Sequence, residues 1–195
     1  MSNEWDERYQ HGDTPWEKGR AHPALLDFAR LQPVHGRVLV PGCGHGHDAR
    51  VLAASADEVI GLDIAKSAIK AAESYPIVGG EQYLEADLFD LPPRLRHRFD
   101  WVFEHTSFCA IDPERRRDYV TAVCEALCPG GHVLAIFFLT PEMDPGESGP
   151  PFGTTVAELD ALFSTHFVTL GEWIPSQTFP GREGRELCRL LRLRH

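Results

Sequence analysis

Hydrophobic residues along this chain are spaced in two ways, as short runs typical of β-strands and at the three- to four-residue intervals typical of α-helices. Short apolar runs of β-rich composition occur at residues 37–41, 58–64, 82–88, 99–105 and 132–139. Stretches of helical composition lie between or beside them, at residues 24–31, 47–55, 65–74 and 113–131. This alternation predicts an α/β fold, with a Rossmann-like, doubly wound and mostly parallel sheet and helices on both of its faces.

The C-terminal third departs from this alternation. Residues 140–154 are rich in proline and glycine and are long enough to form a lid over a site rather than a tight turn. A further helix is predicted at 155–166, with Thr154 or Thr155 as its N-terminal cap. Residues 167–174 and the leucine- and arginine-rich C-terminus then supply two closing strands, so we expect a terminal antiparallel strand.

A single domain, residues 1–195, accounts for the whole chain, because 195 residues with 43% hydrophobic residues suffice for one core. Residues 1–23 form an extension rich in aromatic and charged residues, and residues 24–195 form the Rossmann-like core. The longest apolar runs are far shorter than the roughly 20 residues that span a bilayer. The first ten residues carry charges where a secretory signal would be apolar. We therefore expect no membrane partner and a cytoplasmic location.

Charge and cysteine content narrow the possible partners. A formal net charge of −10 argues against a nucleic-acid partner, since binding to phosphates relies on clustered lysine and arginine. Arginines that alternate in part with leucines predict the solvated face of a last strand, at Arg182, Arg185, Arg189, Arg192 and Arg194. The cysteines are odd in number and lack C-x-x-C spacing, so we expect reduced thiols at Cys43, Cys109, Cys124, Cys128 and Cys188.

Candidate chemistry begins at the first turn from strand to helix, VLVPGCGHGHD. In open α/β sheets, ligands bind beyond the carboxyl ends of the strands, and this turn lies there. Gly42, Gly44 and Gly46 let the backbone turn sharply and approach a ligand. The dinucleotide pattern G-x-G-x-x-G would need a glycine where this chain has His47, which disfavours a bound pyrophosphate.

Two carboxylates follow at the ends of the next two strands. Asp63 comes 21 positions after Gly42, close to the spacing of a carboxylate that accepts hydrogen bonds from ribose hydroxyls. Asp87 ends the third strand on the same edge, where it can receive an adenine amino group. The alternative is that both aspartates merely cap the ends of their strands.

A histidine pair on the glycine turn invites a metal hypothesis. His45 and His47 flank a glycine, and Asp48 is the next residue. A zinc site usually takes at least three protein ligands, and no third ligand is obvious in the sequence. We therefore predict no metal here.

Taken together, these residues resemble those of a class I S-adenosylmethionine-dependent methyltransferase. Four stretches, TPWEKGRAHPAL, VLVPGCGHGHD, FEHTSFCAIDPERR and ESGPPF, resemble the thiopurine methyltransferase family, especially its halide and thiol methyltransferases. The similarity runs from Trp5 to Phe152. It implies S-adenosylmethionine as the cofactor and a small-molecule methyl acceptor. Separately, we expect the enzyme to be a monomer.

The resemblance also implies a set of cofactor-binding residues. Trp5, Tyr9 and Trp16 would close over the cofactor, because aromatic faces attract a sulfonium cation and shield it from water; ordinary packing is the alternative for the two tryptophans. The full predicted cofactor site is Trp5, Tyr9, Trp16, Gly42, Cys43, Gly44, Asp63, Ile64, Asp87, Leu88 and His105.

The acceptor side departs from the family pattern. Where relatives often carry an aromatic pair, this chain has His105 and Ser107, and Phe152 stands where some relatives have tyrosine. We predict an acceptor wall of Phe108, Phe138 and Phe152. His105 is the candidate catalytic residue, either as a base for the acceptor or as a partner of the cofactor's amino-acid part.

Methyl transfer from a sulfonium is an in-line displacement that needs alignment and exclusion of water more than a strong base. The resemblance to the halide and thiol branch, the lack of an evident metal site or strong base and the predicted phenylalanine wall together make small, soft nucleophiles (thiols, hydrosulfide and heavier halides) the expected acceptors. Alternatives are an oxygen or nitrogen acceptor, a nicotinamide-dependent oxidoreductase on the same fold, and a nucleoside-binding module without catalysis.

Overall fold

The computed structural model describes residues 2–142 and 149–194. Within them, a seven-stranded sheet has the strand order β3-β2-β1-β4-β5-β7-β6. The strands are β1 Arg37–Pro41, β2 Glu58–Asp63, β3 Glu81–Glu85, β4 Phe99–His105, β5 Leu127–Phe138, β6 Phe167–Trp173 and β7 Glu186–Leu193. The α-helices are α1 Ser2–His11, α2 Pro23–Leu31, α3 His47–Ala53, α4 Lys66–Glu73, α5 Arg116–Ala126 and α6 Val156–Phe163. Short 3-10 helices are η1 Leu88–Asp90, η2 Pro93–Leu95, η3 Phe108–Ala110 and η4 Pro113–Arg115.

Strand pairing confirms the predicted fold class. β3, β2, β1, β4 and β5 pair in parallel, and β7 inserts antiparallel between β5 and β6. The chain order reverses between the neighbours β1 and β4, since β1 continues outward to β2 and β4 continues to β5. That reversal point is where ligands bind in sheets of this kind.

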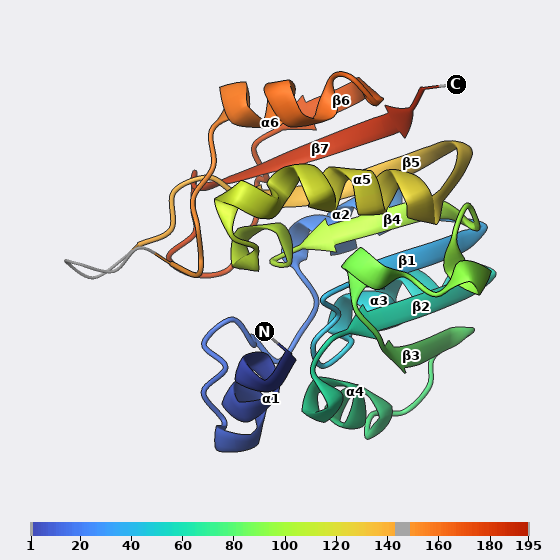
Figure 1. The fold of residues 1–195 in the computed structure, drawn as a ribbon, viewed down its shortest axis with the longest axis vertical. Coiled ribbons are helices and arrows are strands. Elements are labelled where there is room, and N and C mark those ends of the chain that lie inside the picture. The colour runs from blue at the N-terminus through green and yellow to red at the C-terminus, as the bar shows by residue number, and fades with distance from the viewer. Residues whose placement is uncertain (1, 143–148, 195) are drawn as a thin grey trace.

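Helices cover both faces of the sheet, as Figure 1 shows. The alternation along β1 explains this: Val38 and Val40 pack in a core with α2 and α3, while Leu39 packs in the opposite core with α5 and α6. Both cores are shielded from solvent, with Val38 and Leu39 at 0% exposure. Among the described residues, no helix has the length and apolar character needed to cross a membrane.

The predicted helix at 113–131 is wrong at its C-terminal end. α5 ends at Ala126, and β5 begins at Leu127, which pairs with Phe99 of β4. The physical reason lies in the next residues, because Pro129 lacks a backbone N–H and two glycines follow it. The chain therefore enters the sheet five residues before the apolar run at His132.

The solvated arginine face predicted for the last strand is wrong for Arg189. Its side chain is 2% exposed and pairs with Asp160 at 2.8 Å and Glu172 at 2.7 Å. The cause is the position of β7, which lies inside the sheet between β5 and β6 rather than at its edge. A guanidinium can be buried there because carboxylates from α6 and β6 neutralise it.

The helix cap predicted at Thr154 or Thr155 is confirmed, whereas the lid predicted at residues 140–154 is only partly described by the structure. Thr155 caps α6, as its hydroxyl accepts the backbone N–H of Glu158 at 3.1 Å. Residues 143–148 of the lid lie outside the described residues. The described part of that stretch returns to the core, where the N–H of Thr154 donates to the carbonyl of Leu139 at 3.0 Å.

The N-terminal extension contains a helix, α1, that sequence patterning did not predict. It sits apart from the sheet beside α4 (Figure 1). The carboxylate of Asp6 accepts the backbone N–H of Ser67 at 2.6 Å, at the start of α4. A helix with so little apolar surface is fixed by such contacts rather than by an amphipathic stripe.

Candidate active site

A cavity of about 600 Å³ opens at the carboxyl ends of β1, β2 and β4. Its walls come from the N-terminal extension, the glycine turn after β1, the ends of β2, β3 and β4, and the loop before β7. It lies beside the reversal in strand order, as expected for a ligand site on this fold. Its volume suits a ligand of nucleoside size with a small second molecule.

The glycine turn after β1 forms one wall of the cavity, and its tight packing leaves no room for side chains at Gly42 and Gly44. Gly42 and Gly44 have φ angles of +60° and +52°. A Cβ on Gly42 would lie 2.7 Å from the Cβ of Ser107, and one on Gly44 would lie 3.0 Å from the hydroxyl of Tyr9. Glycine therefore lets the extension and the end of β4 come together over the turn.

Asp63 ties this turn to the end of β2. One carboxylate oxygen accepts the N–H of Gly44 and the other accepts the N–H of Ala65, each at 2.9 Å. Burial raises the pKa of Asp63, although backbone hydrogen bonds from Ala65 and Gly44 oppose that effect. The carboxylate lines the cavity, and its oxygens keep lone pairs for further donors.

Asp87 has a similar double position. It caps η1, accepting the N–H of Phe89 at 2.9 Å, and it also lines the cavity. The capping alternative considered for the two aspartates is thus correct as a description of their local bonds, and it leaves acceptor capacity for a ligand. The neighbouring cavity residues include the predicted Cys43, Ile64 and Leu88.

Aromatic residues of the extension make the facing wall. Trp16 packs edge-on against Trp5, with ring centroids 5.3 Å apart, and against Tyr9 at 5.7 Å. The indole N–H of Trp16 donates to the Tyr9 hydroxyl at 3.0 Å, and all three side chains line the cavity. They pack together, as the alternative held, and in doing so they present a polarisable surface to the site.

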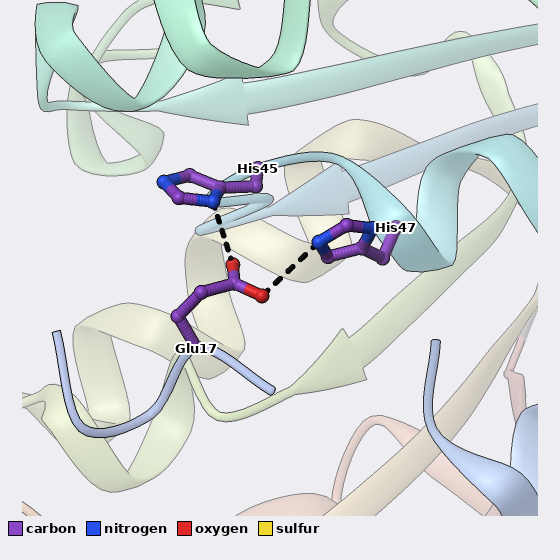
Figure 2. Close-up of side chains that lie close together, drawn as sticks. All are labelled: Glu17, His45 and His47. Atoms are coloured by element: carbon purple, nitrogen blue, oxygen red, sulfur yellow. Dashed lines mark ion pairs between the residues drawn. The ribbon is translucent and has the colours of Figure 1, made fainter. Parts of the chain in front are cut away.

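Figure 2 shows a contact that fastens the extension to the glycine turn. The carboxylate of Glu17 lies 3.0 Å from Nδ1 of His45 and 3.0 Å from Nε2 of His47. We call these three residues the clasp. Glu17 is the third potential metal ligand that the sequence did not reveal, because it lies 28 positions before His45.

The contact between Arg50 and His47 argues against a metal ion in the clasp. Arg50 donates to Nδ1 of His47 at 3.0 Å, so that nitrogen must supply a lone pair. A neutral imidazole then carries its proton on Nε2, which faces Glu17. A metal would need the Nε2 lone pair and would displace the Arg50 contact.

His105, at the end of β4, has a partner that sequence analysis did not connect with it. Its Nδ1 lies 2.7 Å from a carboxylate oxygen of Asp48. The other oxygen of Asp48 accepts the backbone N–H of His22 at 2.8 Å. Both Asp48 and His105 line the cavity. Asp48, which the sequence suggested only as a possible metal ligand beside His45 and His47, is thus the hydrogen-bond partner of His105.

The predicted phenylalanine wall is not assembled as expected. Phe138 lines the cavity. Phe108 is 1% exposed, because η3 turns its ring into the core against Tyr119 and Phe137. Phe152 is half-buried beside Gly149 and is not among the residues that line the cavity. We therefore do not retain Phe108 and Phe152 as acceptor-site residues.

Cationic side chains at the cavity were missed at the sequence level. The guanidinium of Arg182 lies 4.7 Å from the ring centre of Phe138 and donates to Glu186 at 3.1 Å. Burial and the charge of Arg182 both lower the pKa of Lys18. Further cations line the same cavity, at Arg8, Arg20 and Arg115. Lys18 and Arg20 belong to the stretch TPWEKGR, and Arg182 is one of the C-terminal arginines. The solvated strand face predicted for those arginines is wrong for Arg182 too, because it lies before β7 and lines the cavity.

Comparison with known proteins agrees with this geometry. A family model described as Thiopurine S-methyltransferase matches residues 1–172. Thiocyanate methyltransferase 1 of Brassica oleracea is 35% identical, over 93% of this chain and 81% of its own length. A Thiopurine S-methyltransferase of Xanthomonas campestris is 29% identical, over 84% and 82% of the two chains.

Solved structures share the fold. One, from work on the conversion of a disulfide bond into a thioacetal group during echinomycin biosynthesis, has a TM-score of 0.79 at 22% identity, covering 100% of this chain and 92% of its own. The N-methyltransferase NodS from Bradyrhizobium japonicum, in complex with S-adenosylhomocysteine, has a TM-score of 0.74 at 15% identity, covering 100% and 99%.

Proposed function

Because this chain belongs to the thiopurine S-methyltransferase family and is an S-adenosylmethionine-dependent methyltransferase, we propose that it methylates small, soft sulfur nucleophiles, with heavier halides as secondary acceptors. Family membership sets aside the nicotinamide-dependent oxidoreductase and the non-catalytic nucleoside-binding module. An oxygen or nitrogen acceptor is the alternative that the experiment below tests.

The residues around the cavity fit this cofactor. The positive φ angles of Gly42 and Gly44 form a cradle that a Cβ would fill. In the proposed arrangement, Asp63 accepts the ribose hydroxyls and Asp87 receives the adenine amino group. When bound, the cofactor supplies a methyl group attached to a positively charged sulfur. Trp5, Tyr9 and Trp16 would shield that cation from water, as aromatic faces attract it.

The observation that carries the acceptor proposal is the pairing of cations with aromatic rings at one end of the cavity. Arg182 lies over Phe138, and Arg20 lies 5.8 Å from the ring centre of Phe179. A chain of net charge −10 repels anions at long range, so local cations are needed to admit one. A polarisable anion such as a thiolate or hydrosulfide is matched by both the charge and the apolar rings.

The thiocyanate methyltransferase relative supports an acceptor of this class, since thiocyanate is a small anion with a soft sulfur. A competition screen with cofactor labelled in its methyl group tests the proposal. Hydrosulfide, small thiols and thiocyanate should have the highest kcat/KM, iodide should follow, and catechols, carboxylates and amines should be slowest. If oxygen or nitrogen acceptors outrun sulfur acceptors, the proposal is wrong.

We extend the proposal to the location, oligomeric state and partners of the enzyme. A cytoplasmic monomer without nucleic-acid partners agrees with the net charge of −10 and with five cysteines that the structure leaves free. Light scattering after gel filtration should give a mass near 21.8 kDa. A mass of twice that value would replace the monomer with a dimer.

A further inference from the structure

We propose that Asp48 and His105 form a dyad in which Asp48 positions His105 as the general base that takes the proton of a thiol acceptor. The inference rests on the proposed function, because it concerns the same acceptor site. His105 is the candidate catalytic residue, and Asp48 is a positioning residue that acts through it.

The hydrogen bonds of Asp48 determine which nitrogen of His105 is free. Asp48 accepts N–H groups on both oxygens, from His105 and from the backbone of His22. Burial alone would raise the pKa of Asp48, but the facing His105 and the His22 N–H outweigh burial and lower it. An ionised carboxylate can only accept, so Nδ1 of His105 carries the proton, and in the neutral imidazole it is Nε2 that has the lone pair.

Nε2 of His105 is buried and lacks a hydrogen-bond partner among the described residues. The side chain as a whole is 10% exposed and lies on the cavity wall. A buried nitrogen with an unused lone pair is rare in folded proteins unless a ligand or water uses it. In this position a thiol proton is a chemically suitable partner.

The groups around His105 are committed elsewhere, which keeps Nε2 free. His22 packs edge-on against His105 at 4.7 Å, but its Nδ1 accepts the N–H of Ala24 at 3.1 Å and its Nε2 faces Glu186 at 2.9 Å. Glu186 also accepts from Arg182 at 3.1 Å.

On its own strand, His105 is preceded by a buried carboxylate that is equally committed. Glu104 accepts the N–H of Phe108 at 2.7 Å and the hydroxyl of Tyr119 at 2.5 Å. Among the described residues, Asp48, His22 and Glu186 lie around the ring of His105, Glu104 acts on it only through its charge from the opposite face of β4, and the group bonded to the ring is Asp48.

The proposed step balances without a further reagent. The S–H bond of the thiol breaks, and its proton forms an N–H bond at Nε2 of His105. The electron pair left on the acceptor sulfur forms the new S–C bond, while the bond from the methyl carbon to the sulfonium sulfur breaks and leaves its pair on that sulfur. The imidazolium, stabilised by Asp48, then releases its proton to water.

The central test compares an acceptor that carries a proton with one that does not. Asp48→Asn keeps the side chain's shape, yet an amide cannot accept from both His105 and His22, because one end now donates. Thiol methylation should fall by roughly 100-fold or more, while iodide methylation should fall by less than about 5-fold. Asp48→Glu, which restores the carboxylate, should recover part of the thiol rate. The matched control is Asp57→Asn, an exposed aspartate that precedes β2 at the opposite edge of the sheet.

A second readout does not depend on activity. Nitrogen-15 NMR of histidine-labelled protein without cofactor should show His105, identified by its loss in His105→Gln, as the Nδ1–H tautomer in the wild type. In Asp48→Asn, that tautomer should give way partly or wholly to Nε2–H. The pH profile of wild-type thiol methylation should also have an acidic limb that iodide methylation lacks.

Three results would overturn the dyad: an Nε2–H tautomer in the wild type, equal losses of thiol and iodide rates in Asp48→Asn, or an iodide profile with the same acidic limb. Equal losses would mean that His105 positions the cofactor instead. If the wild type methylates no thiol at all, the acceptor proposal fails, whereas the tautomer measurement still decides the arrangement of Asp48 and His105.

Discussion

Glu17 lies 3.0 Å from Nε2 of His47, so the N-terminal extension is held to the turn after β1 by a charged contact. The same extension carries the aromatic wall of the cavity. We therefore propose that the clasp and the covering of the cofactor by the extension are linked, so that a change in one alters the other.

Glu17→Gln should loosen the extension. Burial raises the pKa of Glu17, but the neighbouring His47 and the N–H of Gly19 outweigh it and lower the pKa, so Glu17 keeps its negative charge at neutral pH. We expect faster amide hydrogen exchange in residues 4–17 and roughly 3- to 10-fold weaker cofactor binding. Glu7→Gln, at an exposed site on α1, is the control. Unchanged exchange and affinity would show that the clasp does not hold the extension.

Binding of S-adenosylhomocysteine should slow hydrogen exchange across the extension in the wild type. The physical reason is that Trp5, Tyr9 and Trp16 line the cavity and would lose solvent when it fills. The measurement is exchange with and without ligand, followed by mass spectrometry. Equal exchange in both states would reject the extension as a cover for the cofactor.

Asp63→Ala should weaken cofactor binding. Charge-assisted hydrogen bonds to ribose hydroxyls contribute about 1.5–3 kcal/mol, or roughly one to two powers of ten in affinity. Asp63 also holds the N–H of Gly44, so part of any loss comes from a looser turn. Asp63→Asn separates these effects in part, because its amide oxygen can still accept from Gly44, although its amide nitrogen can no longer accept from Ala65. Calorimetry with S-adenosylhomocysteine gives both affinities, and an unchanged affinity in Asp63→Ala contradicts the assignment.

The parts of the site that follow from local spacing were predictable. Gly42, Asp63 and Asp87 belong to consecutive strand-and-turn units, and the parallel order of those units brings their ends to one edge. Strand positions depended on apolar runs that the core requires, and they were placed within a few residues. The end of α5 was misjudged because leucine at 127 suits a helix as well as a strand.

Contacts between distant segments were not predictable from the same patterns. Asp48 and His105 are 57 residues apart, and Glu17 reaches His45 from an extension whose helix has no amphipathic signal. Arg189 resembled a solvated arginine because its carboxylate partners lie on α6 and β6. Each of these depends on which elements become neighbours, and periodicity along the chain does not specify that.

Ionisation of the Glu186 carboxyl should make the free energy of unfolding depend on pH in the acidic range. Burial raises its pKa, but hydrogen bonds from His22 and Thr178 and the charge of Arg182 lower it to about 2, from an ordinary value of 4.5. A carboxyl with a depressed pKa contributes stability that is present above pH 4.5 and is lost as pH falls toward 2. A pKa lowered from 4.5 to about 2 corresponds to about 3 kcal/mol of stability, and solvent screens little of it because Glu186 is 1% exposed.

Glu186→Gln should therefore unfold at lower urea concentration at pH 7, and the difference from the wild type should shrink as the pH falls from 4.5 to 2. Urea titrations at several pH values measure both effects. Glu183→Gln, at an exposed position three residues earlier, controls for the loss of one negative charge. A difference that stays constant over this pH range would show that the carboxylate's ionisation does not contribute.

Lys18 tests whether the acceptor enters as an anion. It lies at the mouth of the cavity near Arg182, and the charge of that arginine, together with burial, lowers its pKa. Lys18→Met keeps much of the stem but removes the charge, so KM for hydrosulfide and iodide should rise about 3- to 10-fold with little change in kcat. Added salt should raise the wild-type KM and narrow the gap between the two proteins, because it screens the lysine charge. Lys66→Met, on the exposed side of α4, should leave KM unchanged. A fall in kcat with constant KM would instead mean that Lys18 acts on the transfer step. Equal KM values for the two proteins at every salt concentration would mean that charge attraction by Lys18 does not contribute to acceptor binding.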